Sequence, residues 1–186
     1  MITLHDILIH YGIGPHYVKL VRHGNKEIPI LETFQNDRKR FEVYQSYQNP
    51  NRFSGANHLA VFAPGHHTSA IFLGLWDIKE YVTNKNFTEK LHETIDKYSF
   101  PDSWHKSAWY DLRYNSILEE LSERLIIDWG RSTISWVQKR NKNILEIKGK
   151  NYLGDFISYD SVQLNYYDLK KLSGGAKSNT TWMNAL

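Results

Sequence analysis

Two clusters in this sequence place aromatic rings beside amide or carboxylate side chains. The first is Tyr44-Gln45-Ser46-Tyr47-Gln48, and the second joins Asp128-Trp129 to Ser135-Trp136-Val137-Gln138. Aromatic rings can stack on nucleic-acid bases, while amides and carboxylates supply hydrogen-bond donors and acceptors for a base edge. The clusters therefore indicate a base-reading site. An alternative stays open for each of them, because most aromatic side chains simply pack in a core.

Basic side chains form a second group of candidate binding residues. Cations of this kind contact phosphates, which adds affinity for DNA without sequence information. The net charge of +3 and the pI of about 8.9 permit an anionic partner without requiring one. A solvated surface is the alternative for each residue. The residues expected at phosphates are Arg22, His23, Arg38, Arg40, Arg131, Lys139 and Arg140.

The familiar signatures of catalysis and metal binding are missing from the sequence. Gly12-Ile13-Gly14 is not followed by the Lys and Ser or Thr of a phosphate-binding loop. His66-His67 lacks a third ligand at zinc spacing, and the absence of Cys removes thiolate chemistry. We therefore expect no catalytic residue, no metal and no cofactor in this chain.

The composition is that of a folded protein of about one domain. Of the 186 residues, 41% are hydrophobic and 23% are charged, which excludes a disordered chain. The absence of Cys fits a reducing compartment, and the N-terminus lacks the features of a secretory signal. The longest apolar runs fall far short of the roughly 20 residues of a membrane helix. We expect a cytoplasmic protein.

Hydrophobic spacing predicts the elements that position these residues. A 3–4 spacing predicts helices from Thr3 to Tyr11 and from Leu31 to Tyr47, and a short last helix over 167–172. Residues 79–105 predict a long loop with one helical turn, and 116–124 a further turn. Apolar or alternating runs predict strands over 18–21, 58–63, 69–78, 109–112, 125–129, 132–139, 144–147 and 156–159.

These elements predict an α+β fold with a mixed, mainly antiparallel curled sheet. Two or three helices would flank it, and the sheet would form a partly open β-barrel. The runs 58–63 and 69–78 read as its hairpin. In the strand over 132–139, Trp136 shares a face with Ile134 and Gln138. If that face lines the barrel mouth, the indole of Trp136 can stack on a base.

Four segments, taken in order, resemble the N-terminal domain of a bacterial family whose C-terminal part is a GIY-YIG nuclease. The segments run over 18–23, 40–48, 70–78 and 125–130, the last followed by Ser135-Trp136-Val137-Gln138. The resemblance implies a DNA-recognition domain over 1–172. It also implies a linker over 173–186 toward a nuclease domain. A divalent metal would be needed in that nuclease domain only.

Architectures of this kind are similar to modification-dependent restriction systems of antiviral defence. There a PUA-like or EVE-like barrel recognises a modified base in double-stranded DNA, which usually requires flipping the base out of the stack. The expected function is therefore a non-catalytic specificity domain of a restriction-like endonuclease. The alternative is a protein-interaction or structural module that positions the nuclease.

Overall fold

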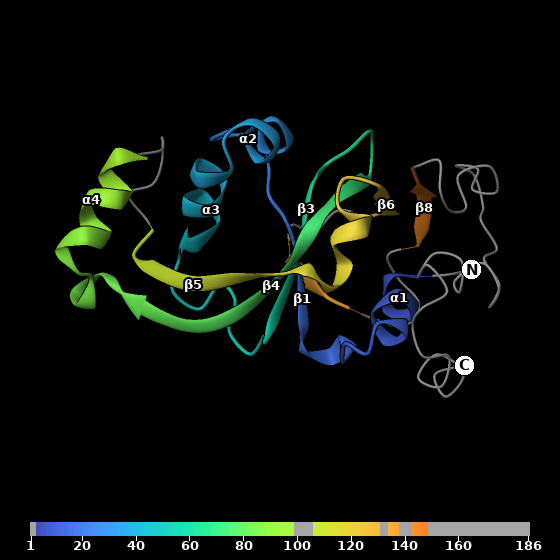
Figure 1. Ribbon diagram of the computed structural model, residues 1–186, viewed down its shortest axis with the longest axis horizontal. Coiled ribbons are helices and arrows are strands. Elements are labelled where there is room, and N and C mark those ends of the chain that lie inside the picture. The colour runs from blue at the N-terminus through green and yellow to red at the C-terminus, as the bar shows by residue number, and fades with distance from the viewer. Residues whose placement is uncertain (1–2, 99–105, 131–133, 138–142, 149–186) are drawn as a thin grey trace.

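The computed structural model describes residues 3–98, 106–130, 134–137 and 143–148. Within them, the chain has the expected α+β architecture, with a mixed, mostly antiparallel sheet that curls strongly into a half-barrel (Figure 1). The expected last strand over 156–159, the last helix over 167–172 and the linker over 173–186 lie outside the described residues. No helix in the described part of the chain is long and apolar enough to span a membrane.

The sheet is organised around one long central strand, β4. The strand order of the sheet is β2-β5-β4-β3-β1-β7. Strand β6 pairs with β4 beyond the end of β5, and it also pairs with β8. Among the described strands, only β1 and β3 run parallel. The strands are β1 (Val18–Arg22), β2 (Tyr47–Gln48), β3 (His58–Pro64), β4 (Ser69–Thr83), β5 (Ala108–Asn115), β6 (Leu125–Asp128), β7 (Ile134–Trp136) and β8 (Ile144–Ile147).

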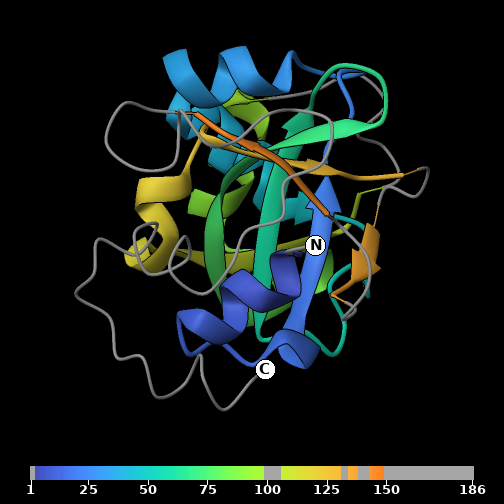
Figure 2. The ribbon, with the colours of Figure 1, turned by 90° about the vertical axis from the view of Figure 1, so that its right-hand side faces the viewer.

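Helices cover both faces of this sheet. Helices α2 (Ile30–Asn36) and α3 (Arg38–Ser46) lie over one face, and α1 (Leu4–His10) lies on the opposite side (Figures 1 and 2). Helix α4 (Glu89–Lys97) stands at the end of the sheet that β4 and β5 form (Figure 1). A 3-10 helix, η4 (Ser116–Leu121), follows β5.

The sheet separates two apolar cores, because successive residues of a strand point to opposite faces. On β1, Val18 and Leu20 join the core beneath α1, whereas Val21 joins the core beneath α2 and α3. Trp129 belongs to the first core and Tyr44 to the second. The aromatic residues singled out in the sequence therefore lie on different faces of the sheet.

The structure confirms the opening helix, the first strand and the central hairpin. It corrects two expectations. The single helix expected from Leu31 to Tyr47 is two helices, because Asp37 has φ −143° and its side chain accepts a hydrogen bond from the Arg40 N–H at 3.2 Å. The long loop expected over 79–105 instead begins with the continuation of β4 to Thr83 and contains α4, which is capped by the Thr88 hydroxyl.

Candidate functional site

A cluster of buried polar side chains lies on the face of the sheet that α3 covers. It collects residues from the segment after β1, from α3, from the loop after β2 and from Lys106, which precedes β5. We call it the polar cluster. Its members are His23, Glu27, Tyr44, Gln45, Asn49, Arg52 and Lys106.

The last turn of α3 and the loop that follows build one side of the polar cluster. The Gln48 amide donates to the Tyr44 carbonyl oxygen at 2.7 Å, which closes the helix end. The loop then turns at Asn51 and at Gly55, whose φ values are +66° and +78°. Phe53 anchors it, since its ring packs on Tyr110 at 4.8 Å between centroids. The loop over 49–55 is thereby held above the cluster.

In one part of the polar cluster, the cation is paired with a carboxylate. The Lys106 ammonium lies 2.8 Å from a Glu27 carboxylate oxygen and 4.3 Å from the centroid of the Tyr44 ring. Burial lowers the pKa of Lys106, although the Glu27 carboxylate opposes this. Burial and the same carboxylate raise the pKa of Tyr44 to about 12. The Tyr44 phenol therefore stays protonated near neutral pH.

The other half of the cluster holds Arg52 without a counter-ion. No carboxylate of the described residues lies within ion-pair distance of its guanidinium, and its buried Nε has no hydrogen-bond acceptor there. Burial lowers the pKa of Arg52, but a guanidinium stays charged in proteins. A half-buried cation of this kind is a recognised feature of sites for carboxylates, phosphates and polar base edges.

Three more buried polar atoms of the cluster make no hydrogen bond of normal geometry within the described part of the chain. They are His23 Nε2, Gln45 Oε1 and Asn49 Oδ1. An unsatisfied buried group costs about 1–3 kcal/mol, so native proteins keep few of them. Burial, helped by the charges of Arg52 and Lys106, lowers the pKa of His23 to about 3 against the opposing effect of the Gln45 side chain. His23 is therefore neutral at pH 7.

Trp136 stands at the rim of the same face. It pairs in register with Lys19 of the neighbouring strand, and the Lys19 ammonium lies 5.1 Å from the indole centroid. Trp136 is 37% exposed, and a Cβ added at Gly55 would lie 3.8 Å from its ring. Burial and then the charge of Arg52 lower the pKa of Lys19. The Trp136 indole, Lys19 and the loop over 49–55 are thus neighbours.

The structure brings together part of the site expected from the sequence. His23, Tyr44, Gln45 and Gln48 meet at the polar cluster, with Trp136 at its rim. The other expected residues that the structure describes lie elsewhere. Arg38 and Arg40 are exposed near the start of α3, and Arg131, Gln138, Lys139 and Arg140 lie outside the described residues, as does the side chain of Ser135.

Trp129 and Arg22 belong to the opposite face, and Asp128 lies at the end of β6. Trp129 is only 1% exposed and packs on Phe62 at 5.1 Å, so here the core-packing alternative holds. The Arg22 guanidinium lies over the Trp129 ring at 5.7 Å. Asp128 is exposed and accepts a hydrogen bond from the Thr68 hydroxyl at 3.1 Å. Arg22 and Trp129 therefore lie apart from the polar cluster.

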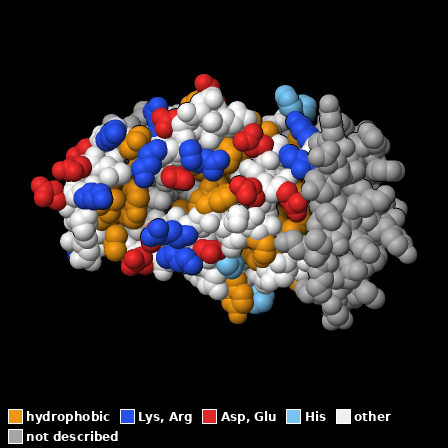
Figure 3. Space-filling view, in the orientation of Figure 1, with side chains coloured by type: hydrophobic (Ala, Val, Ile, Leu, Met, Phe, Trp, Pro, Cys, Tyr) orange, Lys and Arg blue, Asp and Glu red, His pale blue; other side chains and the backbone are white. Residues whose placement is uncertain are grey.

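Positive charge does not form one continuous field on the face seen in Figure 3. Lys and Arg side chains there alternate with Asp and Glu, and apolar side chains lie between them (Figure 3). Electrostatic attraction on this face is therefore local. Any preference for an anionic ligand depends on individual cations such as Arg52 and Lys19.

Sequence reasoning did not select Glu27, Asn49, Arg52 and Lys106 as site residues. Only the loop sequence Asn49-Pro50-Asn51-Arg52, directly after the amide-rich end of α3, carried a usable signal. The arrangement suits binding, because it offers a neutral imidazole, amide oxygens and a fixed guanidinium. The described residues contain no group of three His, Asp or Glu that could hold a metal ion.

Comparisons with known proteins found no match to this chain. No protein-family model matches it, and no curated protein or solved structure is significantly similar to it. The structure therefore supports the expected PUA-like fold only as far as a curled mixed sheet with helices.

Proposed function

We propose that this chain is a DNA-binding specificity module that holds one base at the polar cluster. The observation that carries the proposal is Arg52, a half-buried guanidinium without a carboxylate partner in the described chain, whose charge acts on the buried His23 imidazole. Buried polar groups of this kind become favourable when a ligand edge supplies the missing hydrogen bonds. A base edge carries donors and acceptors side by side, as this set requires.

Trp136 and Lys19 complete the proposed contact. An exposed indole next to the loop can stack on a base, and Lys19 beside it can meet the neighbouring phosphate. The neutral His23 at the cluster fits an uncharged base rather than a second phosphate. The site thus separates stacking and phosphate contact at the rim from hydrogen-bond reading inside.

The finer assignment comes from the resemblance of the four sequence segments. It supports a recognition domain for a modified base in duplex DNA, with a PUA-like barrel, serving a restriction-like GIY-YIG endonuclease in the cytoplasm. In this proposal the chain itself cuts nothing and carries no cofactor. A recognition role without catalysis agrees with the polar cluster, whose side chains offer hydrogen-bond donors and acceptors for binding.

The test is DNA binding by the full chain at several stated salt concentrations. Matched duplexes would carry unmodified, methylated, hydroxymethylated or glucosylated cytosine. We expect one modified duplex to bind best, with affinity falling as salt rises. Arg52→Gln should weaken binding of that duplex at least tenfold, whereas Lys90→Gln on the exposed face of α4 should change it less than twofold. Equal affinity for every duplex, or an Arg52→Gln variant that binds normally, would refute the proposal.

A further inference from the structure

Strand β5 leaves most of one edge unpaired within the described chain. On one side it pairs with β4 from Ala108 to Asn115. On the other side β2 reaches only Trp109 and Ala108, and no described strand continues along residues 110–115. Since successive residues of a strand direct their N–H and C=O groups to alternate sides, half of these residues direct theirs to the open edge. Such an edge is a template for a further strand.

A groove of about 370 Å³ lies along this open edge, and its charges are balanced. Residues 109–114 of β5 form one wall, and α3 forms the other. Each wall carries one cation and one carboxylate, which are Arg113 and Asp111 on the strand and Lys39 and Glu42 on the helix. A ligand with a single sign of charge gains nothing from this balance. The walls favour a partner that is itself balanced in charge.

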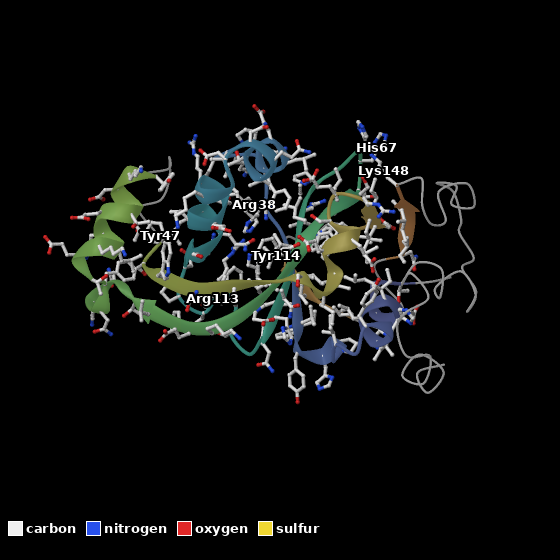
Figure 4. All side chains as sticks on the ribbon, viewed as in Figure 1. Arg38, Tyr47, His67, Arg113, Tyr114 and Lys148 are labelled. Atoms are coloured by element: carbon white, nitrogen blue, oxygen red, sulfur yellow. The ribbon has the colours of Figure 1, made fainter. Side chains whose placement is uncertain are left out.

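The side chains of the strand wall alternate between the two faces of the sheet. Tyr110 belongs to the core beneath α2 and α3, and Leu112 packs against that core. Tyr114 lies on the same side of the strand as α3 (Figure 4). Asp111 and Arg113 therefore point to the other face. There the Nη2 and Nε atoms of Arg113 lie 3.0 and 2.9 Å from the two carboxylate oxygens of Asp111.

The order of these five residues complements itself when the strand is reversed. Read forward it is Tyr-Asp-Leu-Arg-Tyr, and read backward it is Tyr-Arg-Leu-Asp-Tyr. In an antiparallel pair of β5 strands centred on Leu112, Asp111 of each copy stands opposite Arg113 of the other. Tyr110 of each copy stands opposite Tyr114. Aromatic pairs and opposite-charge pairs stabilise adjacent strands, whereas like charges directly opposite destabilise them.

We propose that a second copy of this chain binds at the open edge, with the two β5 strands antiparallel about a twofold axis at Leu112. A twofold interface is self-complementary, so the surface that forms it needs both signs of charge. The strand wall meets this requirement residue by residue. The same axis sets the two α3 helices antiparallel on one side of the joined sheet, where the order of Lys39 and Glu42 is reversed in the same way.

The paired segment is short, so we expect a reversible dimer that forms as the protein concentration rises. The charged side chains of the pair are partly exposed in the single chain, at 27% for Asp111 and 67% for Arg113. Their substitution should therefore leave the fold intact. This interface does not rest on the proposed DNA contact.

Two charge variants of the full chain test this inference. In Asp111→Arg, cations of one copy face cations of the other, and in Arg113→Asp, carboxylates face carboxylates. Sedimentation equilibrium over a wide range of concentration should show a dimer for the unaltered chain and at least tenfold weaker dimerisation for each variant. An equimolar mixture of the two variants should regain the dimer, because each charge then meets its opposite. The control Glu93→Arg on the exposed face of α4 should dimerise within twofold of the unaltered chain.

A chain that stays monomeric at every concentration would overturn the inference. So would variants that dimerise like the unaltered chain, or a mixture that does not regain the dimer although circular dichroism shows both variants folded. Backbone hydrogen exchange should slow for amides within 110–115 as the dimer forms, and slowing elsewhere alone would move the interface to another surface. Slowed exchange at 110–115 in a lasting monomer would assign the edge to another segment of the same chain.

DNA binding separates this inference from the proposed function. Both single variants, diluted until they are monomeric, should keep the duplex preference of the unaltered chain. A dimer that follows the charge rules therefore supports the inference even if no duplex binds.

Discussion

Mild acid should destabilise this protein through His23. The imidazole is 2% exposed, packs edge to face on Tyr44 at 5.2 Å, and has its pKa lowered to about 3 mainly by burial. In the unfolded chain the pKa of a histidine is about 6.5. Between these two values the unfolded state binds a proton that the folded state does not bind. Stability therefore rises with pH across this window and is lost as pH falls through it.

The magnitude follows from the size of the shift. Each pH unit well inside the window is worth about 1.4 kcal/mol, so lowering the pH from about 7.5 to about 4.5 should remove about 2.7 kcal/mol through His23 alone. Carboxylates also titrate in this range, so the unaltered chain by itself does not isolate the effect. A comparison with His23→Gln isolates the effect, because the variant lacks the imidazole and keeps all the carboxylates.

Urea unfolding followed by circular dichroism would measure the free energy of unfolding at pH 7.5, 6.5, 5.5 and 4.5. The difference between the unaltered chain and His23→Gln should change by about 2.7 kcal/mol between about pH 7.5 and about pH 4.5, in favour of the variant. His66→Gln, at the exposed turn of the hairpin, should keep the slope of the unaltered chain. Parallel curves for the unaltered chain and His23→Gln would refute the reasoning about burial.

Three further predictions concern the two faces and the helix boundary. Trp136→Ala should cost about 1–3 kcal/mol of DNA affinity, whereas Trp129→Ala should cost about 3–5 kcal/mol of folding stability by thermal unfolding; large destabilisation with unchanged affinity for Trp136→Ala would remove it from the site. Glu27→Gln should destabilise the fold by about 3–5 kcal/mol by stranding the buried Lys106, and adding Lys106→Met should restore most of the loss in urea unfolding; a single variant as stable as the unaltered chain contradicts this. Asp37→Ala should cost about 1 kcal/mol in the same assay by removing the cap of α3, and no loss would contradict the capping role.

Elements with a clean period were predictable from the sequence. Helix α1 and the hairpin of β3 and β4 follow apolar spacing and end at glycine, proline or polar turns. The division between α2 and α3 was missed because Phe34 and Phe41 are seven residues apart, a spacing that continues across the break at Asp37. Helix α4 was missed because it has no buried residue, so its apolar pattern is weak, although its cap at Thr88 was readable.

The site was predictable only in part, since it depends on contacts between distant segments. The amide-rich end of α3 was found because its residues are adjacent in the sequence. Glu27 and Lys106 are 79 positions apart in the sequence, and no local sequence pattern predicts that they pair. Strand alternation placed Trp129 and Trp136 on pleated strands, but it did not decide which face carries a core. That choice depends on the whole sheet and on the helices that cover each side.

The most direct test of the central claim is the side-chain NMR signal of Arg52 during titration with the best-bound modified duplex. The Nε–H signal can be assigned with Arg52→Lys in the full chain. If a base edge binds at the polar cluster, this Nε–H gains an acceptor, so its signal should shift and its exchange with water should slow at saturation. The Arg113 signal on β5 should change much less. Saturated DNA binding with an unchanged Arg52 signal would contradict the account.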